Sequence, residues 1–158
     1  MMHLFDRPLP LEELLAETAN DGSGALIIFA GTVRNYNEGR AVERIDYSAY
    51  APLAERSMAE IETETLQRFD ITACRVCHRV GTLELGEASI YAVVRAGHRA
   101  EAFEAARWAV EALKHRVAVW KHEHYADGDS DWLDGTALTP ETAPEAAPPR
   151  NKTGTTDS

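Results

Sequence analysis

Basic side chains are concentrated between residues 95 and 121, where six of the chain's 16 basic residues lie. Three acidic residues share this segment, so its formal charge is +3, whereas the whole chain carries −10 with an isoelectric point of about 5.0. Cations gathered in an acidic chain can form a pocket for an anionic ligand, because local potential steers a ligand more than net charge does. A solvated helix face is the simple alternative. The acidic net charge argues against nonspecific nucleic-acid binding.

Two parts of this segment could hold an anion. Gly97-His98-Arg99 stands between an apolar strand pattern and a helix, where free backbone N–H groups and the helix dipole favour negative charge. Lys114 lies in the last turn of that helix, a position also favourable to the dipole alone. A short strand folding back would return Lys121 to the same edge as Lys114. Arg34 follows another apolar strand pattern, where a surface charge is equally common.

Cys74-Arg75-Val76-Cys77-His78 matches the C-x-x-C-H pattern of covalent haem attachment. The N-terminus lacks an export signal, and in a strand the spacing of three residues points the two thiols to opposite faces. We therefore predict core cysteines, neither a haem site nor a redox pair.

His122-Glu123-His124 has the spacing of a metal site on one strand face, with His115 as a possible third ligand. No further carboxylate or cysteine stands at a ligand-like spacing. We expect exposed polar residues at a strand exit, with no metal and no cofactor.

The elements that position these residues form an α+β pattern. An acidic helix is predicted over Pro8 to Ala19, and a central strand covered on both faces over Gly24 to Val33. A loop from Arg34 to Arg40 and a strand from Val42 to Tyr47 follow. Two long amphipathic helices over a sheet of four or five strands complete the prediction. The remaining helices are expected at about 52–69 and 100–115, and the remaining strands at 71–79, 89–96 and 117–121.

Residues 135–158 contain four of the seven prolines, one leucine and no Val, Ile, Phe, Tyr or Trp. Such a segment cannot offset its ordering entropy by burial, so we predict one domain over 1–134 and a disordered Pro/Thr/Ala-rich tail. No apolar run reaches the length of a membrane span, and the cysteine content fits a reducing compartment. We expect a cytoplasmic location.

An ordered series of residues resembles the large, catalytic subunit of molybdopterin synthase, over about Gly24 to Trp132. Single members are weakly specific, but the series in order is highly specific. It comprises Gly24-Ala25, Phe29, Gly31, Val33-Arg34-Asn35, Gly39, Tyr47, Tyr50, His78-Arg79-Val80-Gly81, Leu83, Gly86-Glu87, Ala96, His98-Arg99, Ala102-Phe103, Leu113-Lys114, Trp120-Lys121-His122-Glu123 and Trp132.

This resemblance implies an α/β hammerhead-like fold, a homodimer within a heterotetramer, and a small ubiquitin-like subunit bound at each end. It also implies sulfur transfer from the C-terminal glycine thiocarboxylate of that subunit to cyclic pyranopterin monophosphate, which forms the dithiolene of molybdopterin. Lys114 and Lys121 would be catalytic. The implied substrate-binding set is Thr32, Val33, Arg34, His98, Arg99, Lys114, Lys121, His122 and Glu123.

The chain departs from the family pattern at Val119, where proline is usual, and at His122, where a basic residue is usual. A noncatalytic anion-binding or partner-binding adaptor is the main rival, and a ligand-sensing α+β domain is a third possibility. An adaptor has no need for Lys114 and Lys121 beside His98-Arg99, and a sensing domain predicts none of the ordered series.

Overall fold

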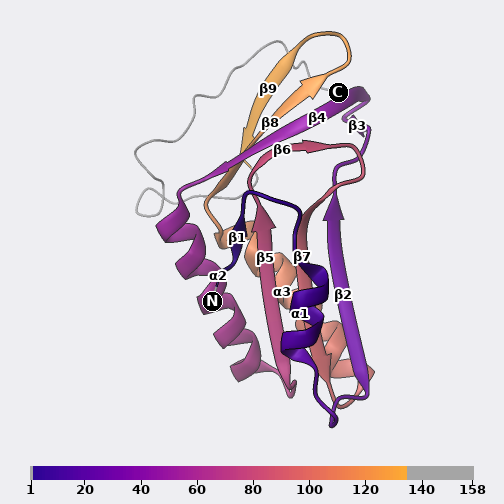
Figure 1. Cartoon of the computed structure of the whole chain (residues 1–158), viewed down its shortest axis with the longest axis vertical. Helices are drawn as coiled ribbons and strands as arrows, with labels where there is room; N and C mark the ends of the chain where they lie inside the picture. Colours follow the sequence, from indigo (N-terminus) through magenta and orange to yellow (C-terminus); the bar gives the residue numbers. More distant parts are fainter. Residues whose placement is uncertain (1, 135–158) are drawn as a thin grey trace.

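The computed structural model describes residues 2–134, which form three helices and nine strands (Figure 1). The predicted tail at 135–158 lies outside the described residues. The helices are α1 (Leu11–Thr18), α2 (Ala51–Arg68) and α3 (Arg99–Arg116). The strands are β1 (Leu4–Phe5), β2 (Ala25–Thr32), β3 (Tyr36–Asn37), β4 (Arg40–Ala49), β5 (Ala73–Arg79), β6 (Gly81–Glu84), β7 (Ala88–Ala96), β8 (Val119–Tyr125) and β9 (Ser130–Asp134).

A four-stranded mixed sheet, in the order β1-β5-β7-β2, forms the body of the molecule. Only β1 and β5 run parallel. Helices α2 and α3 cover one face, where Met58, Ile61 and Val94 belong to the main core, and α1 covers the other face through Leu14 (Figure 1). The α+β class is therefore confirmed, and both long helices begin and end within about two residues of their predicted bounds.

The prediction of a central strand at 24–33 is wrong, because β2 is an edge strand of this sheet. Among the described residues, β2 pairs with β7 alone, and its side chains alternate between half-buried and exposed. Leu26 and Ile28 are 39% and 40% exposed. An apolar run on both faces usually indicates a strand covered on both sides. Here the second face carries apolar side chains that nothing among residues 2–134 covers fully.

A second sheet of five strands stands at one end of the first, in place of the single sheet that the sequence predicts (Figure 1). β4 is its long central strand and pairs with β3, β6 and β8, while β9 pairs with β8. The predicted loop at 34–40 is a hairpin whose tight turn places Glu38 and Gly39 at positive φ. β6 and β9 are strands that the sequence pattern did not reveal.

The helices form for identifiable reasons. Pro52 stands in the first turn of α2, where its missing N–H costs nothing. α3 presents a face of small residues, including Ala102, Ala105 and Ala109, that allows close packing on the sheet. Its last turn contains Lys114, His115 and Arg116, which complement the negative end of the helix dipole. No helix among residues 2–134 is long and apolar enough to cross a membrane.

Candidate active site

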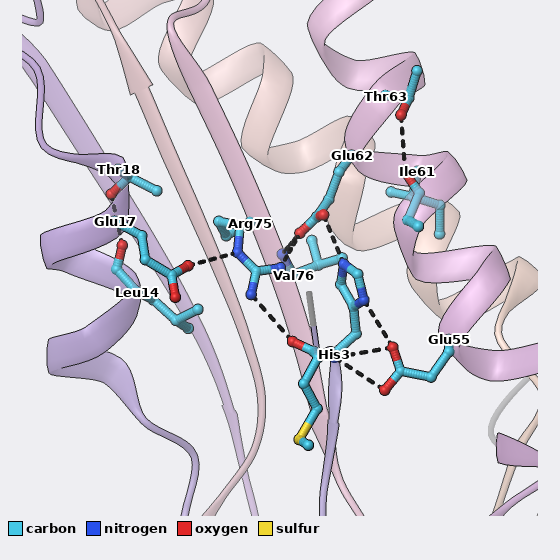
Figure 2. Close-up of polar contacts among 12 residues, drawn as sticks. His3, Leu14, Glu17, Thr18, Glu55, Ile61, Glu62, Thr63, Arg75 and Val76 are labelled. Atoms are coloured by element: carbon cyan, nitrogen blue, oxygen red, sulfur yellow. Dashed lines mark hydrogen bonds and ion pairs between the residues drawn. The ribbon is translucent and has the colours of Figure 1, made fainter. Parts of the chain in front are cut away.

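One cluster of ionisable groups joins β1, β5 and α2 (Figure 2). His3 Nε2 lies 2.7 Å from Glu62 Oε1, and His3 Nδ1 lies 2.9 Å from Glu55 Oε2. Arg75 Nη1 donates to Glu62 Oε2 at 2.8 Å, and its Nε donates to Glu17 at 3.1 Å. Each buried cation of this cluster has a carboxylate partner. The cluster therefore satisfies its own charges and holds the N-terminal strand in place.

The same contacts shift the ionisation of the cluster. Burial alone lowers the pKa of His3, but the hydrogen bonds and charge of Glu62, with help from Glu55, raise it overall. Burial alone raises the pKa of Glu55, but hydrogen bonds from the Leu4 and His3 backbone N–H groups lower it overall. These directions are those of a structural ion network whose charged forms are mutually stabilised.

A pocket lies where the two sheets meet, between the last turn of α3 and the start of β8. Its volume is about 90 Å³, room for about three water molecules. Both predicted catalytic lysines line it, which confirms the prediction that β8 returns Lys121 to the edge occupied by Lys114. The full lining is Tyr47, His78, Ser89, Ile90, Leu113, Lys114, Val117, Val119 and Lys121.

The two lysines differ in their partners. Lys121 Nζ lies 3.3 Å from Glu123 Oε1, and Glu123 is 2% exposed. Glu123 Oε2 also accepts hydrogen bonds from Asn37 Nδ2 at 2.9 Å and from the Tyr125 hydroxyl at 3.0 Å. Glu123 therefore positions Lys121. No carboxylate of residues 2–134 forms an ion pair with Lys114, so its positive charge is available to a ligand.

His78, at the end of β5, is a pocket residue to which sequence reasoning assigned no role. Its Nδ1 lies 2.7 Å from the Arg79 carbonyl oxygen, so Nδ1–H donates and the neutral ring keeps an unprotonated Nε2. Burial lowers the pKa of His78 to about 4; the Arg79 carbonyl opposes this shift, and the charge of Lys114 adds to it. The pocket thus contains a neutral imidazole beside a cationic lysine.

Tyr47 and Ser89 are the other polar residues of the pocket, and sequence reasoning assigned neither a chemical role. The Tyr47 ring packs edge-on against His78 with centroids 5.1 Å apart, and burial raises the pKa of its hydroxyl. Ser89 Oγ donates to the Gly31 carbonyl at 3.2 Å. The resemblance includes His78 and Tyr47, but only the strand registers, which pair Tyr47 with Lys121 and His78 with Ile90, reveal that they share a pocket with the lysines.

Thr32 is the last residue of β2, and Val33 and Arg34 follow it, at the end of the strand that is nearest this pocket, since Gly31 pairs with Ile90. Val33 is 3% exposed and packs in the second core, so its side chain is structural. Thr32 and Arg34 are exposed, and the Arg34 guanidinium lies 5.0 Å from the centroid of the Tyr36 ring. Arg34 therefore presents a cation at the pocket end of the sheet that has no ion-pair partner in the part of the chain that the structure describes.

His98 and Arg99 lie at the opposite end of the molecule. His98 caps the N-terminus of α3 and Arg99 begins the helix, and both side chains are exposed. Fifteen helical steps separate Arg99 from Lys114, about 22 Å along the helix axis. One chain therefore does not bring His98 and Arg99 to the lysine pocket.

Three other motif residues point away from the pocket. His122 follows Lys121 on β8 and so projects from the other face of the strand, where its ring stacks on Trp132 with centroids 4.5 Å apart. Cys74 and Cys77 belong to cores on opposite faces of the first sheet, as predicted. Burial raises the pKa of Cys74 to about 12 and that of Cys77 to about 11, which makes both thiols unreactive.

Comparison with known proteins gives consistent results. Residues 4–116 match the MoaE protein family. A molybdopterin synthase catalytic subunit from Pyrococcus abyssi is 43% identical over 130 residues, 82% of this chain and 87% of the relative. The crystal structure of molybdopterin synthase from Staphylococcus aureus superposes with a TM-score of 0.78 at 31% identity, over 83% of this chain and 95% of that chain.

A complex of subunits 1 and 2 of molybdopterin-converting factor from Helicobacter pylori has the same fold. Its chain superposes with a TM-score of 0.65 at 20% identity, over 79% of this chain and 85% of that chain.

Proposed function

Because the chain belongs to the MoaE protein family, we propose that the pocket between Lys114 and Lys121 is the place where it transfers sulfur. The chain is a molybdopterin synthase catalytic subunit, a sulfurtransferase of molybdenum-cofactor biosynthesis. The observation that carries the assignment of the pocket is the cation of Lys114, which has no carboxylate partner among the described residues and lies beside the neutral imidazole of His78.

The sulfur donor is the C-terminal glycine thiocarboxylate of a small ubiquitin-like subunit, and the acceptor is cyclic pyranopterin monophosphate. The complex of two converting-factor subunits from Helicobacter pylori supports a partner of this kind. A pocket of about 90 Å³ has room for the narrow end of a peptide. The thiocarboxylate therefore enters the pocket, and the pterin phosphate binds at its mouth.

The contacts of each pocket side chain indicate its role in the reaction. Lys114, which has no ion-pair partner among residues 2–134, neutralises the incoming thiocarboxylate and the oxygen that leaves when sulfur attacks the pterin side chain. Water then hydrolyses the resulting thioester, which leaves the sulfur on the pterin and releases the small subunit with a C-terminal carboxylate. Lys121 is held by Glu123 at 3.3 Å and lines the same pocket as a second donor. His78 keeps Nε2 unprotonated and offers it as a neutral hydrogen-bond acceptor, since its pKa of about 4 makes it a weak base. Arg34, exposed at the same end, binds the phosphate through charge-assisted hydrogen bonds.

A second copy of the chain completes the site with His98 and Arg99. The edge of β2 that pairs with no strand of residues 2–134 and the adjoining side of α3 form an apolar groove of about 340 Å³, and Phe103 within it is 60% exposed. An exposed apolar edge strand is a template for pairing with another chain. A homodimer across this face buries Leu26, Ile28 and Phe103.

The symmetry of such a dimer determines what each copy contributes. A two-fold axis perpendicular to the sheet pairs β2 with its symmetry mate in antiparallel fashion. The end of β2 that precedes Arg34 then lies beside the start of the mate's β2, where the Gly97 carbonyl oxygen would be only 2.6 Å from a Cβ at Gly24. His98 and Arg99 follow directly, so the mate's pair reaches the mouth of this chain's pocket.

Reconstitution tests the activity directly. The chain is mixed with a thiocarboxylated small subunit and cyclic pyranopterin monophosphate, and molybdopterin is measured. We expect Lys114→Ala and Lys121→Ala to abolish or nearly abolish product while the small subunit still binds. Near-normal turnover in both variants would exclude the proposed chemistry, whereas no product from the wild type would favour the adaptor.

Mixed dimers test the shared site. Lys114→Ala and Arg99→Ala homodimers each carry a defect in both sites, whereas a mixed dimer has one intact site and one doubly defective site. Random exchange of equal amounts should therefore restore about a quarter of wild-type activity, because half of the dimers are mixed and each has one working site. No recovery after verified exchange would place Arg99 in the same chain's site or outside any site.

A further inference from the structure

A cluster of two imidazoles and one carboxylate lies on the face of β8 opposite Lys121. His122 and His124 are two residues apart on β8, so both project from the same face. Asp46 on β4 is the direct cross-strand neighbour of His122. One ligand atom from each of the three residues can be chosen so that all lie within 4.8 Å of one another.

This spacing is close to that of a metal site. Zinc binds imidazole nitrogen and carboxylate oxygen at roughly 2.0 to 2.2 Å, so tetrahedral ligand atoms lie about 3.3 Å apart. His124 Nε2 and Asp46 Oδ2 are 2.7 Å apart, and the two histidine rings have centroids 4.3 Å apart. Small side-chain rotations therefore bring the three donors around one ion.

The surroundings orient two of the three ligands. Thr82 Oγ1 donates to Asp46 Oδ1 at 2.6 Å, which fixes the carboxylate and leaves Oδ2 facing the histidines. His122 stacks nearly parallel on Trp132, at an interplanar angle of 18°. Hydrogen bonds of this kind to a ligating carboxylate strengthen metal sites. All three ligands are partly exposed, so water can occupy a fourth position.

Arg44 acts against a bound cation. Its guanidinium donates to His124 Nδ1 at 3.3 Å, so in the metal-free protein His124 Nε2 carries the proton and donates to Asp46. Coordination through Nε2 requires that proton to move to Nδ1, which displaces Arg44. The Arg44 side chain is 42% exposed and can swing into solvent. Removing its charge should therefore strengthen metal binding.

We propose that Asp46, His122 and His124 form a binding site for a divalent transition-metal ion, with Zn²⁺ as the ion that suits this donor set best. The sequence supplies the two histidines but not the carboxylate, which comes from a distant strand, whereas His115 lies on α3 and is exposed. A bound ion would tie β8 to β4 directly behind Lys121. The site is independent of the proposed sulfur transfer, since its ligands do not line the lysine pocket.

Calorimetric titration of the full chain, without an affinity tag, with Zn²⁺ tests the site. We expect a single tight ion for the wild type, and affinity at least tenfold weaker for each of Asp46→Asn, His122→Phe and His124→Gln, since even the loss of a group that only supports a ligand costs tenfold or more. The phenylalanine keeps the stack on Trp132 without a donor nitrogen. His115→Gln, which removes an exposed histidine elsewhere, is the matched control and should bind as the wild type does.

A second measurement guards against variants that fail to fold. Zn²⁺ should raise the thermal midpoint of the wild type, a chelator should reverse the rise, and the three ligand variants should not respond. Arg44→Gln should bind Zn²⁺ more tightly than the wild type, an effect that damage to the fold cannot produce. Equal Zn²⁺ affinity in the wild type and all three ligand variants, or no binding by the wild type, would overturn the proposal.

Discussion

The ion network at His3 and the pocket at Lys114 both place basic side chains on or beside β5, but His3 and Arg75 are buried among carboxylates whereas Lys114 is exposed. Arg75, within β5, pairs with one carboxylate from α1 and one from α2. His3 contacts the same carboxylate of α2, Glu62, and a second one, Glu55. His78, three residues later on the same strand, faces a pocket in which Lys114 has no carboxylate partner among the described residues.

This difference in pairing shows how the same residue types can serve either stability or binding. A buried charge with all its partners is stabilised and has nothing left to offer a ligand, whereas an exposed lysine that lines a small pocket and has no ion-pair partner among residues 2–134 can bind an anion at little cost to folding. The two clusters can therefore be distinguished by which property each substitution changes: stability at the network, turnover at the pocket.

The largest effect expected is on turnover at the pocket. Lys114→Ala should lower the rate of molybdopterin formation by about 10² to 10⁴-fold, since a positioned proton donor and charge are lost. The thermal midpoint should change little, because Lys114 has no ion-pair partner among the described residues to lose. Single-turnover assays and thermal melts make the comparison, with His115→Ala, one residue along the same exposed turn, as the control. A large fall in midpoint would mean that the pocket is structural too.

The network should show the reverse. Glu62→Gln removes the buried charge that faces both His3 and Arg75 and should lower the free energy of unfolding by up to about 3 to 5 kcal/mol, because the two cations keep only their more exposed partners Glu55 and Glu17. Activity per folded molecule should be unchanged. Glu64→Gln, on the same helix, breaks the more exposed pair with Arg116 and should cost less than about 1 kcal/mol. Denaturant titrations measure the free energy of unfolding of both variants. Equal losses in Glu62→Gln and Glu64→Gln would contradict the assignment of the network as the structural cluster.

A smaller effect is expected from pH at the pocket. Burial lowers the pKa of His78 to about 4, so between pH 4 and 6.5 the unfolded chain binds more protons than the folded chain. Stability should therefore fall as pH drops through this window, by about 3 kcal/mol from this residue alone. His78→Gln should flatten that acid limb in denaturant titrations at successive pH values. An unchanged slope would show that His78 does not titrate as a buried neutral ring.

The smallest effect, of opposite sign, is expected at His3. Its pKa is raised in the folded chain, so its charged form contributes stability that is fully present below about pH 6.5 and is lost as pH rises through the raised value. The stability difference between wild type and His3→Gln should be largest near pH 6 and should narrow at alkaline pH. A difference that widens with pH would contradict the assigned pairing with Glu62 and Glu55.

The sequence predicts the helices of this fold better than its sheets. Regular apolar spacing defines α2 and α3, because one helix face must pack on the sheet. β2 was predicted as central because its apolar residues occupy both faces, and the sequence alone does not distinguish a face covered within the chain from one left at an edge. β6 and β9 are short, and their pairing with β4 and β8 is a tertiary property.

The candidate site is likewise predictable from the sequence only where its residues are close together in the chain. Lys114 and Lys121 are close in sequence across one helix-to-strand connection, so local geometry was enough to bring them together. His78 joins them only through the register of the first sheet, and Asp46 meets His122 only through that of the second. His98 and Arg99 were grouped with the lysines by chemistry, but the length of α3 holds them apart.

The length of α3 fixes both the distance and the relative rotation between its two ends. Each residue inserted between Arg99 and Lys114 would lengthen the helix by about 1.5 Å and turn one end about 100° relative to the other. A single insertion would thus rotate His98 and Arg99 by about 100° relative to Lys114, even in a helix that still folds. We expect chain-length variation among relatives to fall in turns such as that between β8 and β9, where Gly128 adopts a positive φ, and to spare the interior of α3.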